Sequence, residues 1–120
     1  MANTPHILIA DDDRQIRTSI TRFLSDSGFR VSAAEDGVAA FAAVENGRFD
    51  LVVLDIKMPG MDGIQTLNEI KKIDKDQHVI LCSAYGEFKQ DFSSWVSDAY
   101  VVKSADMREL KETIKNVLGV

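Results

Sequence analysis

The stretch Leu51-Val52-Val53-Leu54-Asp55, which continues as Ile56-Lys57-Met58-Pro59-Gly60, decides the predicted fold. Its first four residues are all apolar, so a strand made of them carries apolar side chains on both faces. Such a strand is typical of the middle of a parallel sheet that helices cover on both sides. Proline and glycine then favour a turn. The carboxylate of Asp55 is therefore expected at the carboxyl end of a central strand.

Further apolar runs lie on either side of this stretch, and segments of helical period separate them. The predicted strands are His6–Asp11, Arg30–Ala34, Leu51–Asp55, His78–Ser83 and Ala99–Lys103. Five strands that alternate with five helical segments predict an α/β fold of the (βα)5 type, a doubly wound parallel five-stranded sheet. Polar and apolar residues alternate in the second strand, which predicts an edge position.

Two aspartates are expected to begin helices. Asp13 follows the first strand directly and is predicted to cap the helix after it. Asp106, with Glu109 three residues later, is predicted to form a capping pair at the last helix.

Composition excludes several classes of protein. The 120 residues carry 14 Lys and Arg against 19 Asp and Glu, and the resulting charge of −5 disfavours direct nucleic-acid binding. The longest apolar run, Val38–Val44, is far shorter than the roughly 18 residues of a membrane span, so no membrane insertion is expected. The N-terminus lacks the features of a secretory signal, which predicts a cytoplasmic protein. Cys82 is the single cysteine and is expected to be a small buried side chain.

Reactive side chains gather where the predicted strands end. Four of the five strands finish with an acid, a hydroxyl or an ammonium group, and the residues concerned are Asp11, Asp12, Asp55, Ser83 and Lys103. Ligands of doubly wound sheets bind at this edge. If the first and third strands are neighbours, about 4.8 Å apart, their carboxylates converge. Carboxylates clustered without cysteine or histidine suit Mg²⁺ or Mn²⁺. A carboxylate can also attack phosphorus, so Asp55 is the predicted nucleophile and aspartyl phosphate the predicted product.

The order of these motifs resembles that of a known family. The matching stretches are Ile7-Leu8-Ile9-Ala10-Asp11-Asp12-Asp13, Leu54-Asp55-Ile56-Lys57-Met58-Pro59-Gly60-Met61-Asp62-Gly63, Ser83-Ala84-Tyr85-Gly86 and Tyr100-Val101-Val102-Lys103. Together they resemble the receiver domain of two-component response regulators, the CheY-like family, and look most similar to single-domain phosphorelay receivers of the sporulation type. The resemblance implies one receiver domain over residues 1–120 and the flavodoxin-like strand order 2-1-3-4-5.

The same resemblance implies a role for each acidic residue. Asp55 would accept a phosphoryl group from the phosphohistidine of a sensor histidine kinase or a phosphotransfer protein. Asp12, Asp55 and the backbone carbonyl of Lys57 would bind Mg²⁺. Asp11 would act mainly through a water molecule bound to the metal. The chain would then be a signalling switch that catalyses only its own phosphorylation and dephosphorylation, and not an enzyme that turns over a free substrate.

The remaining site residues would respond to the phosphoryl group. Lys103 would pair with it, Ser83 would hydrogen-bond to one of its oxygens, and Tyr100 would turn inward when Ser83 moves. This rearrangement would control binding of a downstream protein target. The sequence departs from the family where Ser104 replaces the usual proline and where the fourth helical segment is short.

Two other functions remain open from the residues alone. The chain could be a receiver-shaped interaction module that does not depend on phosphorylation. The two departures leave this open, but the intact site residues argue against it, namely Asp11, Asp12, Asp55, Ser83 and Lys103. It could also be a Mg²⁺-dependent phosphatase with an aspartate nucleophile, but such enzymes commonly place a second acid two residues later, where this chain has Lys57. Nucleotide or flavin binding is disfavoured because an acidic loop, and not a glycine-rich one, follows the first strand.

Overall fold

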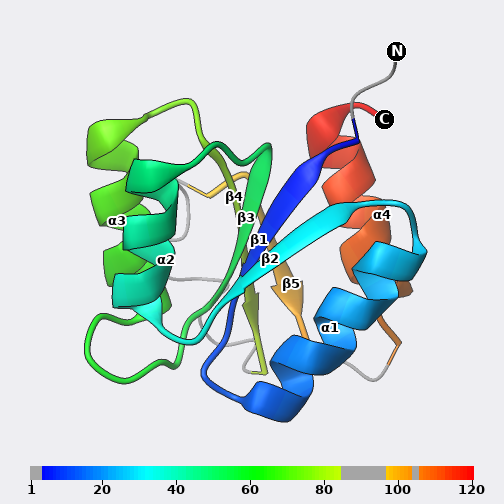
Figure 1. Ribbon diagram of the computed structural model, residues 1–120, viewed down its shortest axis with the longest axis horizontal. Coiled ribbons are helices and arrows are strands. Elements are labelled where there is room, and N and C mark those ends of the chain that lie inside the picture. Colours follow the sequence, from blue (N-terminus) through cyan, green and yellow to red (C-terminus); the bar gives the residue numbers. More distant parts are fainter. Residues whose placement is uncertain (1–3, 85–96, 104–105) are drawn as a thin grey trace.

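The computed structural model describes residues 4–84, 97–103 and 106–120, and this part of the chain forms one sheet with helices on both faces (Figure 1). The strands are β1 (His6–Ala10), β2 (Arg30–Ala34), β3 (Leu51–Asp55), β4 (His78–Ser83) and β5 (Ala99–Val102). The helices of the described part are α1 (Arg14–Asp26), α2 (Gly37–Asn46), α3 (Gly63–Ile73) and α4 (Arg108–Leu118).

All neighbouring strands are parallel, and their order is β2-β1-β3-β4-β5. The predicted α/β fold and strand order are therefore confirmed, and β2 is an edge strand as predicted. The first and last strands are one residue shorter than predicted, so Asp11 and Lys103 directly follow β1 and β5. The helix predicted between β4 and β5 falls in residues 85–96, and Ser104 in residues 104–105, both outside the described residues.

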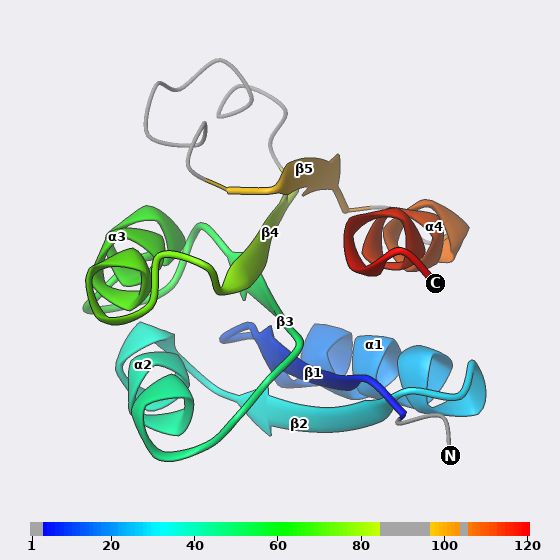
Figure 2. The same cartoon turned by 90° about the horizontal axis from the view of Figure 1, so that it is seen from above.

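Each face of the sheet has its own apolar core. Helices α1 and α4 cover one face, and α2 and α3 cover the other (Figure 2). Ile7 and Ile9 point to the first core, while Leu8 and Ala10 point to the second, because successive side chains of a strand alternate between faces. This is why the central strands need apolar residues at every position. Leu51–Leu54 is almost completely buried.

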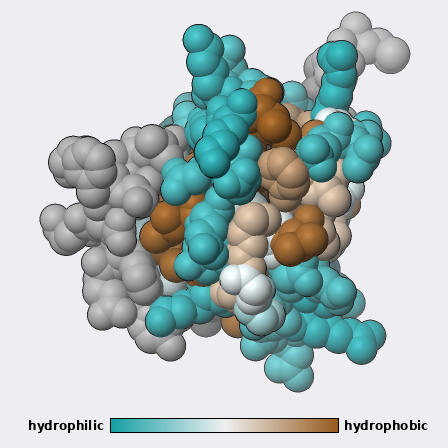
Figure 3. Space-filling model, turned by 90° about the vertical axis from the view of Figure 1, so that its left-hand side faces the viewer, coloured by the Kyte–Doolittle hydropathy of each residue, from teal (hydrophilic) through white to brown (hydrophobic). Residues whose placement is uncertain are grey.

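The surface of the layer formed by α2 and α3 is mostly hydrophilic. Figure 3 looks onto the side formed by α2 and α3, where hydrophilic side chains surround smaller apolar areas. Val38 of α2 and Ile73 of α3 are the large apolar residues of these helices that remain exposed. No helix of the described residues is long and apolar enough to cross a membrane.

The helix starts confirm one prediction and correct another. The Asp13 carboxylate accepts hydrogen bonds from the backbone N–H of Gln15 and of Ile16, at 2.9 and 3.2 Å, and caps α1 as predicted. The predicted capping pair of Asp106 and Glu109 is wrong. Helix α4 begins at Arg108 after Met107, which makes no side-chain cap.

The position of the cap explains this correction. The Asp106 carboxylate accepts hydrogen bonds from the backbone N–H of Arg108 at 3.0 Å and from its guanidinium at 2.7 Å. Because Met107 and not Asp106 occupies the cap position, Glu109 is the second residue of the helix, and the reciprocal pair with Asp106 does not form.

Candidate functional site

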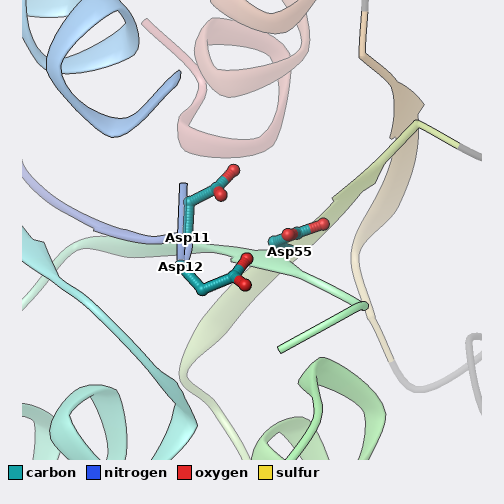
Figure 4. A group of neighbouring side chains, drawn as sticks. All are labelled: Asp11, Asp12 and Asp55. Carbon is teal, nitrogen blue, oxygen red and sulfur yellow. The ribbon is translucent and has the colours of Figure 1, made fainter. Parts of the chain in front are cut away.

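Three carboxylates meet at the carboxyl end of the sheet. Asp11 and Asp12 follow β1, Asp55 ends β3, and the two strands are neighbours in which Ala10 pairs with Leu54. One oxygen from each carboxylate lies within 4.8 Å of the others, and the three side chains point into the same space (Figure 4). Asp11 and Asp55 are buried, whereas Asp12 is exposed. The predicted convergence of these residues is confirmed.

An ammonium group partly neutralises the cluster. Lys103 Nζ lies 2.6 Å from Asp11 Oδ2 and 3.2 Å from Asp55 Oδ1. The backbone N–H of Lys103 donates to the carbonyl of Ser83 at 2.7 Å, so the residue is fixed at the end of β5. Burial alone would lower the pKa of Lys103, but its hydrogen bond to Asp11 and the charge of Asp55 outweigh burial and raise it. Lys103 is therefore a permanent cation of the site.

One ammonium does not balance three carboxylates. Burial raises the pKa of Asp55 from 3.8 to about 6; the charge of Lys103 lowers it, and the charges of Asp11 and Asp12 raise it further. Ionised Asp55 is thus held in an unfavourable environment that a further cation would relieve. The donors that face this space are carboxylate oxygens, which are hard ligands, so the residues present fit Mg²⁺.

Each polar group of Asp11 has a hydrogen-bond partner. Its N–H donates to the Ala34 carbonyl at 3.2 Å, and its carboxylate accepts from the N–H of Asp13 at 2.9 Å. Its carbonyl accepts a 2.7 Å hydrogen bond from Nη1 of Arg17 in α1. Sequence reasoning missed Arg17. The signal that could have found it is a long basic side chain one turn into the helix that follows the acidic loop.

The loop after Asp55 depends on close backbone contact. The N–H of Gly63 donates to the Ile56 carbonyl at 2.9 Å. A Cβ atom on Gly63 would lie 2.1 Å from the carbonyl oxygen of Asp55, so only glycine lets α3 begin this close to the strand end. Met58 is buried and Lys57 is exposed. The predicted role of the Lys57 carbonyl as a metal ligand stays a prediction.

The two predicted switch residues lie on neighbouring strands. Ser83 ends β4 and is fully buried, with its strand partner Val102 in β5. Tyr100 pairs with Leu81 and packs on the core that α2 and α3 cover. Ser83 thus lies at the carboxyl edge, and Tyr100 precedes that edge by two residues. Their response to phosphorylation stays a prediction.

Cys82 and the two histidines have structural surroundings. Cys82 lies inside β4, and burial raises the pKa of its thiol to about 12, which confirms the prediction of a small buried side chain. His6 and His78 begin β1 and β4, at the edge of the sheet opposite the carboxylates. Neither histidine is near the acidic cluster.

Comparison with known proteins identifies the family. The model of the response regulator receiver domain matches residues 7–115. Sporulation initiation phosphotransferase F of Bacillus subtilis is 36% identical, over 93% of this chain and 92% of that protein. The PrrA regulator of Mycobacterium tuberculosis is 33% identical over 96% of this chain, which spans 50% of that longer protein.

Solved structures agree with this result. Response regulator TrrA of Thermotoga maritima, in complex with Mg²⁺ and BeF, has a TM-score of 0.94 and 42% identity, covering 96% of this chain and 100% of that one. A CheY-like receiver domain from Methanospirillum hungatei has a TM-score of 0.91 and 32% identity, covering 98% and 95%. Fold, carboxylate cluster and sequence similarity all lead to one conclusion, that this chain belongs to the response regulator receiver domain family.

Proposed function

We propose that Asp55 is the residue on which this receiver domain is phosphorylated. The three carboxylates differ in ways that support this choice. Asp11 is engaged by Lys103 at 2.6 Å and by the N–H of Asp13, and Asp12 lies at the exposed side of the cluster. Asp55 is the carboxylate that ends the central strand, beside the turn after β3, and its contact with Lys103 is longer, at 3.2 Å. This placement carries the proposal.

The cofactor of the site is Mg²⁺. Asp11, Asp12 and Asp55 would hold it, and the Lys57 carbonyl would be a further ligand. When bound, the metal supplies positive charge that stabilises the phosphoryl oxygens during transfer. The ammonium of Lys103 is the cation that the chain itself supplies for the same oxygens. The three carboxylates would thus provide the negative charge that holds the metal, and Lys103 the positive charge that faces the phosphoryl oxygens.

The proposed reaction moves one phosphoryl group. A carboxylate oxygen of Asp55 forms a bond to phosphorus while the bond from phosphorus to an imidazole nitrogen of the donor breaks. The nitrogen keeps the electron pair of that bond, and Asp55 becomes an aspartyl phosphate. As a receiver domain, the chain is a phosphoacceptor and not a turnover enzyme.

The relatives support a histidine kinase or phosphotransfer protein as donor. A second TrrA structure, with a TM-score of 0.91 and 42% identity, is described as a complex with histidine kinase ThkA. The relative from Bacillus subtilis is named as a phosphotransferase of sporulation initiation, which supports a place in a phosphorelay. We extend both features to this chain, with a cytoplasmic location and one receiver domain over residues 1–120.

The proposed output begins at Ser83 and Tyr100. An aspartyl phosphate carries about 1.5 to 2 negative charges at the end of the strands where Ser83 lies, in place of the single charge of the carboxylate, and such a charge can bias a neighbouring loop between two arrangements. The buried position of Ser83 and the half-buried position of Tyr100 support their coupling through β4 and β5. A downstream protein would recognise the resulting surface.

Incubation with Mg²⁺ and acetyl phosphate, followed by intact-mass spectrometry, tests the acceptor. The wild-type chain should gain the mass of one phosphoryl group, which hydroxylamine removes, and Asp55→Asn should gain none. Asp26→Asn, at the exposed end of α1, is the matched control and should behave as the wild type. Phosphorylation of Asp55→Asn would disprove the assignment of the acceptor. Absence of phosphorylation in every variant would favour an interaction module that does not use it.

A further inference from the structure

Arg17 is the basic residue that reaches from α1 into the acidic loop. Its Nη1 donates to the Asp11 carbonyl at 2.7 Å, and its backbone N–H donates to the Asp13 carbonyl at 2.9 Å. The side-chain hydrogen bond is partly buried, and so is the residue. Arg17 therefore donates to the backbone carbonyls on either side of Asp12, and these bonds involve no carboxylate.

The carbonyl that Arg17 holds belongs to the peptide unit between Asp11 and Asp12. A peptide unit is planar, so fixing its carbonyl also fixes the direction in which the chain enters Asp12. Asp11 does not need this help, because its N–H and its carboxylate have other partners. In the part of the chain that the structure describes, the exposed carboxylate of Asp12 has no hydrogen bond or ion pair of its own. Its direction therefore depends on the backbone.

We propose that Arg17 is a positioning residue for Mg²⁺ binding, which orients the Asp11–Asp12 peptide so that the Asp12 carboxylate faces Asp11 and Asp55. Arginine suits this task because its guanidinium is planar, always charged and long enough to cross from the helix to the loop. The inference concerns the metal site that the proposed function uses. It does not depend on which carboxylate becomes phosphorylated.

Isothermal titration of the unphosphorylated full chain with Mg²⁺ tests the proposal. Loss of a group that orients metal ligands from outside typically weakens metal binding by 10- to 100-fold, and Arg17 acts through one peptide, so Arg17→Ala should weaken it by about 10-fold. Arg14→Ala is the matched control, because Arg14 carries the same charge in the same helix and is exposed. It should change the affinity by less than about twofold, since salt screens exposed charges.

Two further readouts separate positioning from charge and from general damage. Removal of a positive charge would by itself raise the affinity for Mg²⁺, and salt screens that gain, so the loss in Arg17→Ala should persist in about 0.5 M KCl. In acetyl phosphate reactions, Arg17→Ala should raise the half-saturating Mg²⁺ concentration by the same factor and leave the plateau rate within about twofold. If this variant fails to fold, Arg17→Met, which keeps the aliphatic stem, provides the same measurements.

Three outcomes would overturn the proposal. Unchanged Mg²⁺ affinity would show that Arg17 does not orient a ligand. An equal loss in Arg14→Ala would show that any side-chain truncation near the start of α1 disturbs the site. A lower plateau rate with unchanged half-saturation would place Arg17 in phosphoryl transfer. Because Mg²⁺ binding is measured without phosphorylation, these results stand apart from the Asp55→Asn experiment.

Discussion

Polar groups at the two ends of the strands are satisfied in different ways; we call these ends the amino edge, where the strands begin, and the carboxyl edge, where they finish. At the amino edge, His6 Nε2 lies 2.7 Å from Ser32 Oγ, and the N–H of His6 donates to Asp50 at 2.7 Å. At the carboxyl edge, three carboxylates share one ammonium. One edge is satisfied within the chain, whereas the other needs a cation from solution. The hydrogen bonds at the amino edge stabilise the fold, whereas the candidate functional residues lie at the carboxyl edge.

Removing the ammonium should have the largest effect on this contrast. Lys103→Met leaves two buried carboxylates without their cation, and we expect the free energy of unfolding of the metal-free protein to fall by about 3 kcal/mol. Saturating Mg²⁺ should recover part of this loss. Urea denaturation with EDTA and with Mg²⁺ measures both values.

Lys75→Met is the control for Lys103→Met, because Lys75 is an exposed lysine far along the chain from the cluster. It should change the stability by less than about 0.5 kcal/mol in either condition. Equal losses in the two variants would mean that the carboxyl edge is not strained by its charges.

The pH dependence of stability should reveal Asp55. Because its pKa rises from 3.8 to about 6 on folding, the native state binds a proton more tightly than the unfolded state between these values. This group therefore stabilises the metal-free protein below about pH 4, and that contribution is lost as the pH rises through 6. The loss at pH 7 is on the order of 3 kcal/mol, from a shift of about two pKa units.

Asp55→Asn isolates this contribution. The variant should be more stable than the wild type at pH 7 in EDTA, and the difference should shrink towards pH 4. Saturating Mg²⁺ should flatten the same part of the wild-type curve. Parallel stability curves of the two proteins between pH 4 and 7 would contradict the raised pKa.

The amino edge should respond to loss of a partner by a smaller amount and without any dependence on metal. Asp98 Oδ2 accepts from the N–H of Val79 at 2.7 Å, and its Oδ1 lies 3.2 Å from Nδ1 of His78. Asp98→Ala leaves this N–H without its acceptor and should cost about 1 to 1.5 kcal/mol in thermal or urea unfolding. A cost that Mg²⁺ changes would show that the two edges are coupled.

We expect the smallest loss of stability from a surface ion pair that lies away from both edges. Lys72 Nζ lies 3.0 Å from Glu69 Oε1 on α3, and both side chains are largely exposed. Lys72→Ala should cost less than about 0.5 kcal/mol, because salt and side-chain entropy offset most of such a contact. Comparison of its urea midpoint with that of the wild type checks this, and a cost above 1 kcal/mol would remove the contrast between edge and surface.

Most of the fold could be predicted because short apolar runs in the sequence indicate which segments are buried. Leu51–Asp55 and His78–Ser83 are strands with the predicted bounds, since short runs rich in Val, Ile and Leu suit the covered middle of a parallel sheet. The convergence of Asp11 and Asp55 follows from the sequence if β1 and β3 are neighbours. That strand order came from family resemblance, because local patterns do not fix which strands pair.

Contacts between side chains and distant backbone could not be predicted in the same way. The bond from Arg17 to the Asp11 carbonyl depends on how α1 leaves the loop, and the pattern of α1 shows only which face is buried. The capping pair at Asp106 was wrong because α4 begins one residue later than predicted, after Met107, and Asp106 bonds to Arg108. Lys103 was expected to pair with a phosphoryl group, and here it pairs with Asp11 and Asp55.

In the unphosphorylated protein, the ammonium of Lys103 is the counter-ion of Asp11 and Asp55. The ammonium of Lys103 comes from the end of β5 and crosses β4 to reach the residues that follow β1 and end β3. In the phosphorylation that we propose at Asp55, an arriving phosphoryl group would meet a cation already in position, and the lysine would only have to exchange partners. The same contacts link the end of an outer strand to the middle of the sheet, from Lys103 after β5 to Asp55 at the end of β3.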